Sequence, residues 1–156
     1  MNRRKLTRRA LAILAGLSLA TSSFALKHES GNHVRFATNP QGVIFVTVRT
    51  EGHDAVFILD TGATVTYVDI AALKLDARPQ FFVPVEQTNQ RTSRGVYQLQ
   101  LQMGEEKISG QFIEIDLTGT RRECSCEVVG LLGMDLLSHY VSVEIDFREG
   151  IIRFRR

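Results

Sequence analysis

Hydrophobic and polar residues alternate with a period of two over most of residues 26–156, which is typical of half-buried β-strands. The clearest case is the segment 97–103, in which four apolar side chains alternate with three glutamines. The same pattern, or short runs of apolar and β-branched residues, predicts strands at 42–50, 55–59, 81–88, 111–117, 128–132, 141–147 and 151–155. Short helices are predicted over Asp69–Lys74, with Asp69 as the N-cap, and over Gly133–Tyr140. We therefore expect a mainly β chain of about nine strands with a single core, because it is too short for two.

Two polar segments are predicted to lie between these elements. Asn89–Gly95 is expected to be the exposed tip of a long hairpin made by residues 81–88 and 97–103. Thr118–Glu127 is expected to be a loop.

Residues 1–25 differ from the rest of the chain in composition. They hold five basic residues and no acids, followed by an 11-residue apolar run and a small-residue segment that ends at Ala25. This layout is typical of a secretory signal peptide, with Ser23 and Ala25 at the positions that a signal peptidase reads. We therefore expect a signal peptide at 1–25 and a mature domain at 26–156, exported to the periplasm or secreted. The alternative is an uncleaved anchoring helix, for which the run is short; Thr7–Leu11 also resembles a twin-arginine signal, so both that route and the Sec route stay open.

The charge of the chain is unevenly distributed. The formal net charge is +2, but without the leader the remaining 131 residues carry 14 Lys+Arg against 17 Asp+Glu. A slightly acidic mature domain gives no reason to expect a nucleic-acid partner. No apolar run reaches the roughly 18–20 residues that span a bilayer, so no stable membrane insertion of the mature chain is expected. The composition, with 12 Gly and 2 Cys, also excludes collagen-like and disulfide-rich chains.

The two cysteines form a Cys-x-Cys pair, Cys124 and Cys126. An exported protein meets conditions that permit disulfides, so a local or intermolecular disulfide is the first interpretation and free thiols are the second. If the segment were extended, both side chains would lie on one face, a spacing that rarely suits disulfide geometry. A metal site is the third interpretation of the cysteine pair, because two thiols are an incomplete ligand set and the four histidines are scattered along the sequence. The sequence therefore predicts neither a metal nor another cofactor.

A carboxylate directly follows one of the predicted apolar strands, in the stretch Phe57–Thr64 (FILDTGAT). At the end of a buried strand, Asp60 is expected to be held where desolvation is severe. Thr61 adds a hydroxyl that donates and accepts, and Gly62 permits a tight turn that brings backbone N–H groups near the carboxylate. Two such carboxyl groups about 3 Å apart share a proton, so one can take a proton from water while the other donates to the carbonyl oxygen of an amide. The alternative is that Asp60 only caps its own turn.

This stretch resembles the active-site loop of the retropepsin-like (retroviral-type) aspartic proteases. The residues that carry the resemblance are Ile58–Ala63 (ILDTGA) and Val128–Leu137 (VVGLLGMDLL), with a hairpin between them where the family has its flap. The resemblance covers about residues 33–155. It implies a mainly β, single-domain, closed β-barrel or sandwich with a flap hairpin and a short C-terminal helix, assembled as a twofold homodimer. It also implies hydrolysis of a peptide or protein substrate without a cofactor, and together with the leader at 1–25 it predicts an exported, bacterial-type member of the family.

Carried over by position, the resemblance gives each matching residue of the first loop a role. It implies that Asp60 is the catalytic acid and base. It also implies that Thr61 locks two active-site loops together across the dimer, and that Gly62 and Ala63 shape the loop that faces the substrate. Residues 83–103 would be the flap, from which Tyr97 is a candidate for substrate contact; the alternative is that Tyr97 packs with its apolar neighbours.

The resemblance also identifies a second, pseudo-symmetric loop, made of Gly130, Leu131, Leu132 and Gly133. If Leu131-Leu132-Gly133 aligns with Asp60-Thr61-Gly62, a leucine stands where a second acid is needed. One chain then supplies one catalytic carboxylate, and an active enzyme requires two copies. Of the other acids considered, Asp135 is expected to accept a hydrogen bond from the backbone at the start of the short helix.

Three functions remain open on this basis. The first is an aspartic endopeptidase that acts as a homodimer. The second is a catalytically silent dimeric module of the same fold that binds peptides. The third is a phosphotransferase with Asp60 as the nucleophile, which would need a neighbouring acid and a Mg²⁺ shell that the segment 60–64 does not supply.

Overall fold

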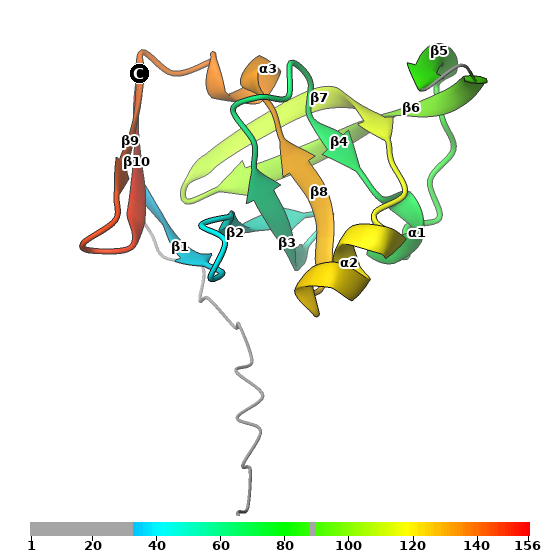
Figure 1. Cartoon of the computed structure of the whole chain (residues 1–156). Helices are drawn as coiled ribbons and strands as arrows, with labels where there is room; N and C mark the ends of the chain where they lie inside the picture. The colour runs from blue at the N-terminus through cyan, green and yellow to red at the C-terminus, as the bar shows by residue number, and fades with distance from the viewer. Residues whose placement is uncertain (1–32, 88–89) are drawn as a thin grey trace, which may run out of the picture.

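The computed structural model describes residues 33–87 and 90–156 (Figure 1). The predicted signal peptide at 1–25 lies outside the described residues. Among the described residues, no helix has the length and apolar character needed to cross a membrane. The strands are β1 (His33–Thr38), β2 (Ile44–Thr50), β3 (His53–Leu59), β4 (Tyr67–Val68), β5 (Phe81–Gln87), β6 (Gln90–Met103), β7 (Glu106–Glu114), β8 (Val128–Leu132), β9 (Ser142–Asp146) and β10 (Ile151–Arg155). The helices are α1 (Ile70–Leu73), α2 (Thr118–Cys124) and α3 (Met134–Leu137).

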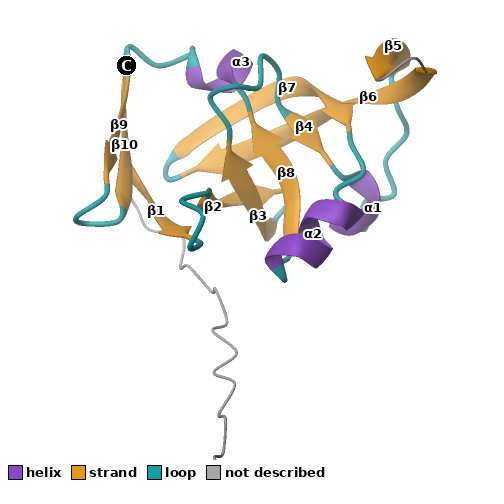
Figure 2. Ribbon diagram, in the orientation of Figure 1, coloured by secondary structure: helices purple, strands orange, loops and turns teal. Residues whose placement is uncertain are grey.

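Six of the strands close into a barrel. The ladder runs β6-β7-β4-β8-β3-β2, and β2 also pairs with β6, with Arg49 opposite Gln102 and Thr50 opposite Leu101. The remaining strands extend the sheet beyond this ring, β5 from β6, and β1, β10 and β9 in that order from β2. The β9–β10 hairpin stands to one side of the barrel and β5 to the other (Figure 2). The predicted mainly β, closed fold is therefore confirmed.

The barrel interior is filled by the apolar faces of alternating strands. In β6 the side chains of Tyr97, Leu99, Leu101 and Met103 are all buried, as the period-two pattern predicts. They pack in one core cluster with Phe57 and Leu132, which have no exposed surface. Full burial of side chains of this size contributes about 1.5–3 kcal/mol each, so this cluster is the main source of stability for the ring.

Two of the local predictions are wrong. Residues 90–95 were expected in a hairpin tip but lie in β6, paired with β5 as far as Gly95 opposite Phe82; residue 89 lies outside the described residues. Polar side chains are compatible with a strand whose faces are solvated, so their polarity did not mark a turn. The expected loop at 118–127 contains α2, whose N-cap Leu117 makes no side-chain capping bond and whose residues are not buried. Asp116 accepts a hydrogen bond from the Thr118 N–H at the start of this helix, and Arg121 joins the helix to the distant Asp69, a contact that cannot be read from local sequence.

Two further predictions about short segments are confirmed. Asp69 is the N-cap of α1, where its side chain accepts a hydrogen bond from the N–H of Ala72. Cys124 and Cys126 form a local disulfide. The segment is not extended, because Ser125 adopts a left-handed backbone conformation with φ 50° directly after α2 and turns the chain back. This turn removes the geometric objection that applies to a straight Cys-x-Cys segment.

Candidate active site

The loop that carries Asp60 joins two strands, β3 and β4, that lie on either side of β8 in the sheet. β8 runs parallel to β3, with Leu131 opposite Ile58, and antiparallel to β4, with Leu131 opposite Tyr67. The chain therefore leaves β3, forms the loop 60–66, and returns as β4 on the opposite side of β8. The N–H of Asp60 donates to the carbonyl oxygen of Leu132 at 3.0 Å, so β8 holds the start of the loop in place.

The carboxylate of Asp60 is oriented by its own turn. The N–H of Gly62 donates to Asp60 Oδ1 at 2.9 Å, and the N–H of Ala63 donates to the Asp60 carbonyl oxygen at 3.2 Å. A Cβ on Gly62 would lie 3.2 Å from Asp60 Oδ1, so glycine keeps this approach open. In the single chain Asp60 is half-buried, and Thr61 is exposed. The severe desolvation predicted for Asp60 is therefore not found in one chain, because β3 ends at Leu59 and the loop extends beyond the core.

A buried threonine braces this loop against the segment after β8. Thr66 has no exposed surface; its hydroxyl donates to Asp135 Oδ1 at 2.7 Å and accepts from the N–H of Gly133 at 3.0 Å. Backbone bonds add to this, from the N–H of Met134 to the Ala63 oxygen at 2.8 Å and from the N–H of Asp135 to the Thr64 oxygen at 3.2 Å. Sequence reasoning missed Thr66, because nothing in its neighbours marks it as a bridge between segments 67 residues apart.

Asp135 also makes the predicted backbone contact at the start of α3, where its Oδ1 accepts from the N–H of Leu136 at 2.8 Å. Its carboxylate is thus shared between Leu136 and Thr66. These contacts make Asp135 a support for the loop rather than a second acid beside Asp60.

The second loop is joined to the first by close packing of its two glycines. A Cβ on Gly130 would overlap the Phe57 ring and lie 2.7 Å from the Tyr67 carbonyl oxygen. A Cβ on Gly133 would overlap the carbonyl group of Val65. Between them, Leu132 is fully buried and Leu131 is half-buried. The structure therefore brings the two predicted loops together and places apolar side chains, not an acid, between the glycines.

Comparison with solved structures identifies the architecture. A retropepsin-like aspartic protease from Rickettsia conorii matches with a TM-score of 0.56 and 18% identity, over 78% of this chain and 89% of that chain. The chain has the retropepsin fold. Simian foamy virus (mac) protease matches with a TM-score of 0.47 and 19% identity over 60% of this chain and 91% of that chain. The EIAV protease complexed with the inhibitor HBY-793 matches with a TM-score of 0.49 and 16% identity, over 66% of this chain and 92% of that chain. No protein-family model and no curated protein sequence matches the chain.

Within this retropepsin fold, the hairpin β5–β6 occupies the position predicted for the flap. Its base is linked to the Asp60 loop through β7, because Val96 pairs with Ile113 and Ile113 pairs with Tyr67 at the exit of that loop. Tyr97 is 7% exposed and belongs to the core cluster, which fits the packing alternative. Burial, and then the charge of Glu114, raise the pKa of Tyr97. The exposed apolar side chains of the hairpin are instead on β5, where Phe82 is 64% exposed.

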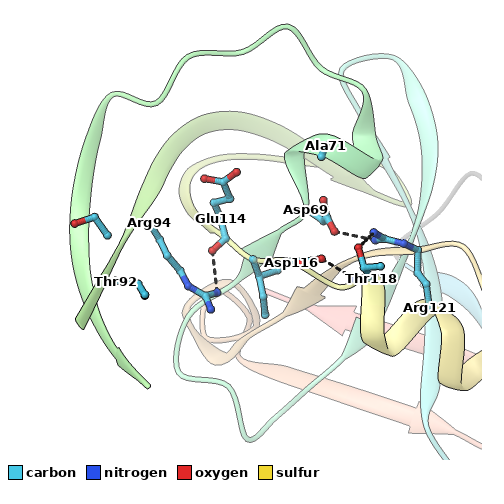
Figure 3. A pocket seen from close by; sticks show the side chains of 10 residues that line it. Asp69, Ala71, Thr92, Arg94, Glu114, Asp116, Thr118 and Arg121 are labelled. Carbon is cyan, nitrogen blue, oxygen red and sulfur yellow. Dashed lines mark hydrogen bonds and ion pairs between the residues drawn. The ribbon is translucent and has the colours of Figure 1, made fainter. Parts of the chain in front are cut away.

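A polar cluster around Asp69 ties the retropepsin barrel to α2 (Figure 3). Asp69 is 3% exposed; besides capping α1, its Oδ2 accepts from the N–H of Leu117 at 2.9 Å and from Arg121 Nη1 at 2.8 Å. Arg121 also donates to the Val128 carbonyl oxygen at 3.1 Å and to Thr118 Oγ1 at 3.1 Å. The cluster lines one side of a pocket of about 460 Å³. It therefore fixes the start of α2 against α1 and β8.

The pKa of Asp69 lies below its ordinary value. Burial acts to raise it, but hydrogen bonds from the Leu117 N–H, Arg121 and the Ala72 N–H, with the charge of Arg121, outweigh burial. A lowered folded pKa means that the carboxylate contributes stability above its unfolded pKa of about 3.9. This contribution is lost as the pH falls through the lower folded value. The Asp69 cluster therefore stays intact at mildly acidic pH.

Asp69→Asn is expected to lower the free energy of unfolding by about 2 kcal/mol at pH 6, because it leaves Arg121 without its buried partner charge. The difference between wild type and variant is expected to shrink below about pH 4, where the Asp69 carboxylate of the unfolded wild-type chain takes up a proton while the folded one stays ionised. Urea unfolding midpoints measured between pH 2.5 and 7 check this, with exposed Asp76→Asn as the matched control. A difference that is the same at pH 3 and pH 6 would contradict it.

Proposed function

We propose that this chain is an aspartic endopeptidase that acts as a twofold homodimer, with one Asp60 from each subunit. The observation that carries the proposal is the geometry of Asp60: a half-exposed carboxylate on a braced loop of a retropepsin fold, with one oxygen held by Gly62. A single chain brings one such carboxylate to this loop, and Thr61 beside it is exposed and free to contact the same loop of a second copy. A twofold axis through this loop would bring two identical acids together.

Two carboxyl groups about 3 Å apart cannot both ionise, so the pair of Asp60 side chains would hold one proton. The ionised Asp60 takes a proton from a water molecule, whose oxygen attacks the amide carbon of the substrate. The protonated Asp60 of the other subunit donates its proton to the amide carbonyl oxygen. Breakdown of the tetrahedral intermediate breaks the C–N bond, with proton transfer to the leaving amine. The chemistry needs no metal, and activity is expected at mildly acidic pH, where the pair keeps its proton.

The hairpin β5–β6 would close over an extended peptide bound along this loop. From the composition of residues 1–25 we also propose that the mature domain works outside the cytoplasm, in the periplasm or as a secreted protein. A catalytically silent peptide-binding dimer of the same fold is the alternative, and the experiment below distinguishes the two.

The test is hydrolysis of an unbiased peptide pool by purified mature protein at pH 4–7, followed by mass spectrometry, over a wide range of protein concentrations. At concentrations below the dimer dissociation constant, the rate is expected to rise with about the square of protein concentration, because only the dimer holds both acids. A pepstatin-like hydroxyl isostere is expected to block cleavage. Constant specific activity in a protein that sedimentation shows to be monomeric would overturn the proposal, and a dimer that binds peptides without cleaving them would support the silent module.

A further inference from the structure

The outer face of β3 leads directly to Asp60. Along this strand Ala55, Phe57 and Leu59 are buried in the core, while Val56 and Ile58 are half-buried on the opposite face. Side chains alternate between the two faces of a strand, so Asp60, which follows β3 at once, continues the face of Ile58. Two residues along a strand span about 7 Å. The side chain of Ile58 therefore lies on the surface that leads toward the loop of the proposed catalytic carboxylate.

A pocket of about 350 Å³ opens at this surface, with an apolar floor made by Ile58, Phe45 and Val43. Phe45 stands opposite Ile58 in the β2–β3 ladder, so the two side chains lie on the same face. Phe45 is only 8% exposed, yet it is not part of the barrel core cluster. Its side chain therefore packs outside that cluster and lines the pocket.

One wall of this pocket is α2, and the uncharged polar residues Asn39 and Gln41 also line it. Thr120, Glu123 and Cys124 line it, and their i, i+3 and i+4 spacing places them on one face of the helix. The bonds of Arg121 to Asp69 and Val128, and of the Leu117 N–H to Asp69, fix this helix against the barrel, and the disulfide from Cys124 to Cys126 closes the turn that follows it. The wall is therefore a fixed part of the surface and does not depend on a bound ligand for its position.

Glu123 gives the pocket a charge. Its side chain is exposed, and no ion pair joins it to another residue in the described part of the chain. An apolar floor with a single carboxylate on one wall matches a side chain with a long aliphatic stem and a cationic end, which is the chemistry of arginine and lysine. A purely aliphatic side chain would use the floor but leave the carboxylate without a partner.

We propose that this pocket binds an arginine or lysine side chain of the peptide substrate, at a position displaced from the cleaved bond toward α2, and that Glu123 determines this preference. The inference rests on the proposed function, since it assigns a substrate class to the same site. Ile58 and Phe45 hold the aliphatic stem, and the Glu123 carboxylate accepts hydrogen bonds from the charged end.

The test uses the Asp60→Asn protein, in which peptides are bound without being cleaved, and two peptides that differ only in arginine against citrulline, its neutral isostere. The arginine peptide is expected to bind about fivefold more tightly, the upper range for a solvent-accessible charge pair, measured by fluorescence anisotropy at low salt. Adding Glu123→Gln to the same protein is expected to remove the difference, while Glu127→Gln, an exposed acid just beyond the disulfide, is expected to keep it. Raising the salt concentration is expected to reduce the preference.

The outcomes separate this inference from the proposed function. Equal binding of the two peptides, or a preference that survives Glu123→Gln, overturns the role of the pocket whether or not wild-type protein cleaves peptides. A preference that depends on Glu123, together with no cleavage of the arginine peptide by wild-type protein, supports the pocket and counts against the protease. Preferential cleavage by wild-type protein of peptides that contain arginine or lysine, with the preference lost in Glu123→Gln, supports both.

Discussion

Asp60→Asn is expected to lower kcat/KM for peptide hydrolysis by at least about 10³-fold. An amide can neither take a proton from water nor share one with residue 60 of the other subunit. The fold is expected to be unaffected. Asp60 is half-buried, and an asparagine Oδ1 can accept the same hydrogen bond that the Gly62 N–H now gives to Asp60 Oδ1. Initial rates on a peptide selected from the pool, with thermal unfolding measured in parallel, check both parts.

The matched control for this substitution is Asp54→Asn, an exposed aspartate near the start of the same strand, which is expected to keep full activity. A mixing experiment tests the dimer directly. Adding an equal amount of the Asp60→Asn chain to wild type is expected to reduce the specific activity of the wild-type chains by about half, since mixed dimers hold one acid. Full activity of the Asp60→Asn variant would contradict the mechanism. Full activity in the mixture would show that one Asp60 is enough for catalysis.

Strand alternation and local turn chemistry predicted the elements that are governed by nearby residues. The buried face of β6 follows from the alternation of apolar and polar residues along the strand itself. Asp69 caps α1 through the N–H of Ala72, only three residues away. The Asp-Thr-Gly segment gave the position of the candidate acid, because a carboxylate followed by a glycine turn is a local pattern. The resemblance that the two motifs suggested agrees with the fold found.

The rest depends on contacts between distant parts of the chain. α2 has no buried residues and its N-cap, Leu117, makes no side-chain capping bond; Asp116 accepts from the Thr118 N–H at 2.8 Å, and the ion pair from Arg121 to Asp69, 52 residues away, positions the helix. The brace through Thr66 and the passage of β8 between β3 and β4 are likewise set by pairing across the sequence. Three residues of α2 line the pocket that contains Ile58, so the prediction of a loop there did not reveal Glu123 as a candidate specificity residue.

Alanine at Gly133 is expected to destabilise the protein by about 3 kcal/mol, at the upper end for overpacking, because the clash is with backbone that cannot rotate away. A Cβ there would overlap the Val65 carbonyl group and lie 2.9 Å from the Thr66 nitrogen. Relieving that overlap requires Gly133, which follows the end of β8, to move away from the Asp60 loop. The same movement would break the bond from the Gly133 N–H to the Thr66 hydroxyl and loosen the one from the Met134 N–H to Ala63.

The expected readouts of Gly133→Ala are a lower denaturant midpoint and a loss of peptide cleavage even under conditions where the variant remains folded. Gly119→Ala is the matched control, since Gly119 lies in α2 and a Cβ there meets nothing within 4 Å. That substitution is expected to raise stability by about 0.5–1 kcal/mol, because alanine loses less backbone freedom in a helix than glycine does. Equal stability of the two alanine variants would show that the close approach of Gly133 to Val65 is not what joins the two loops. The position of Asp60 would then have to depend on the Thr66–Asp135 hydrogen bond and the backbone ladder alone.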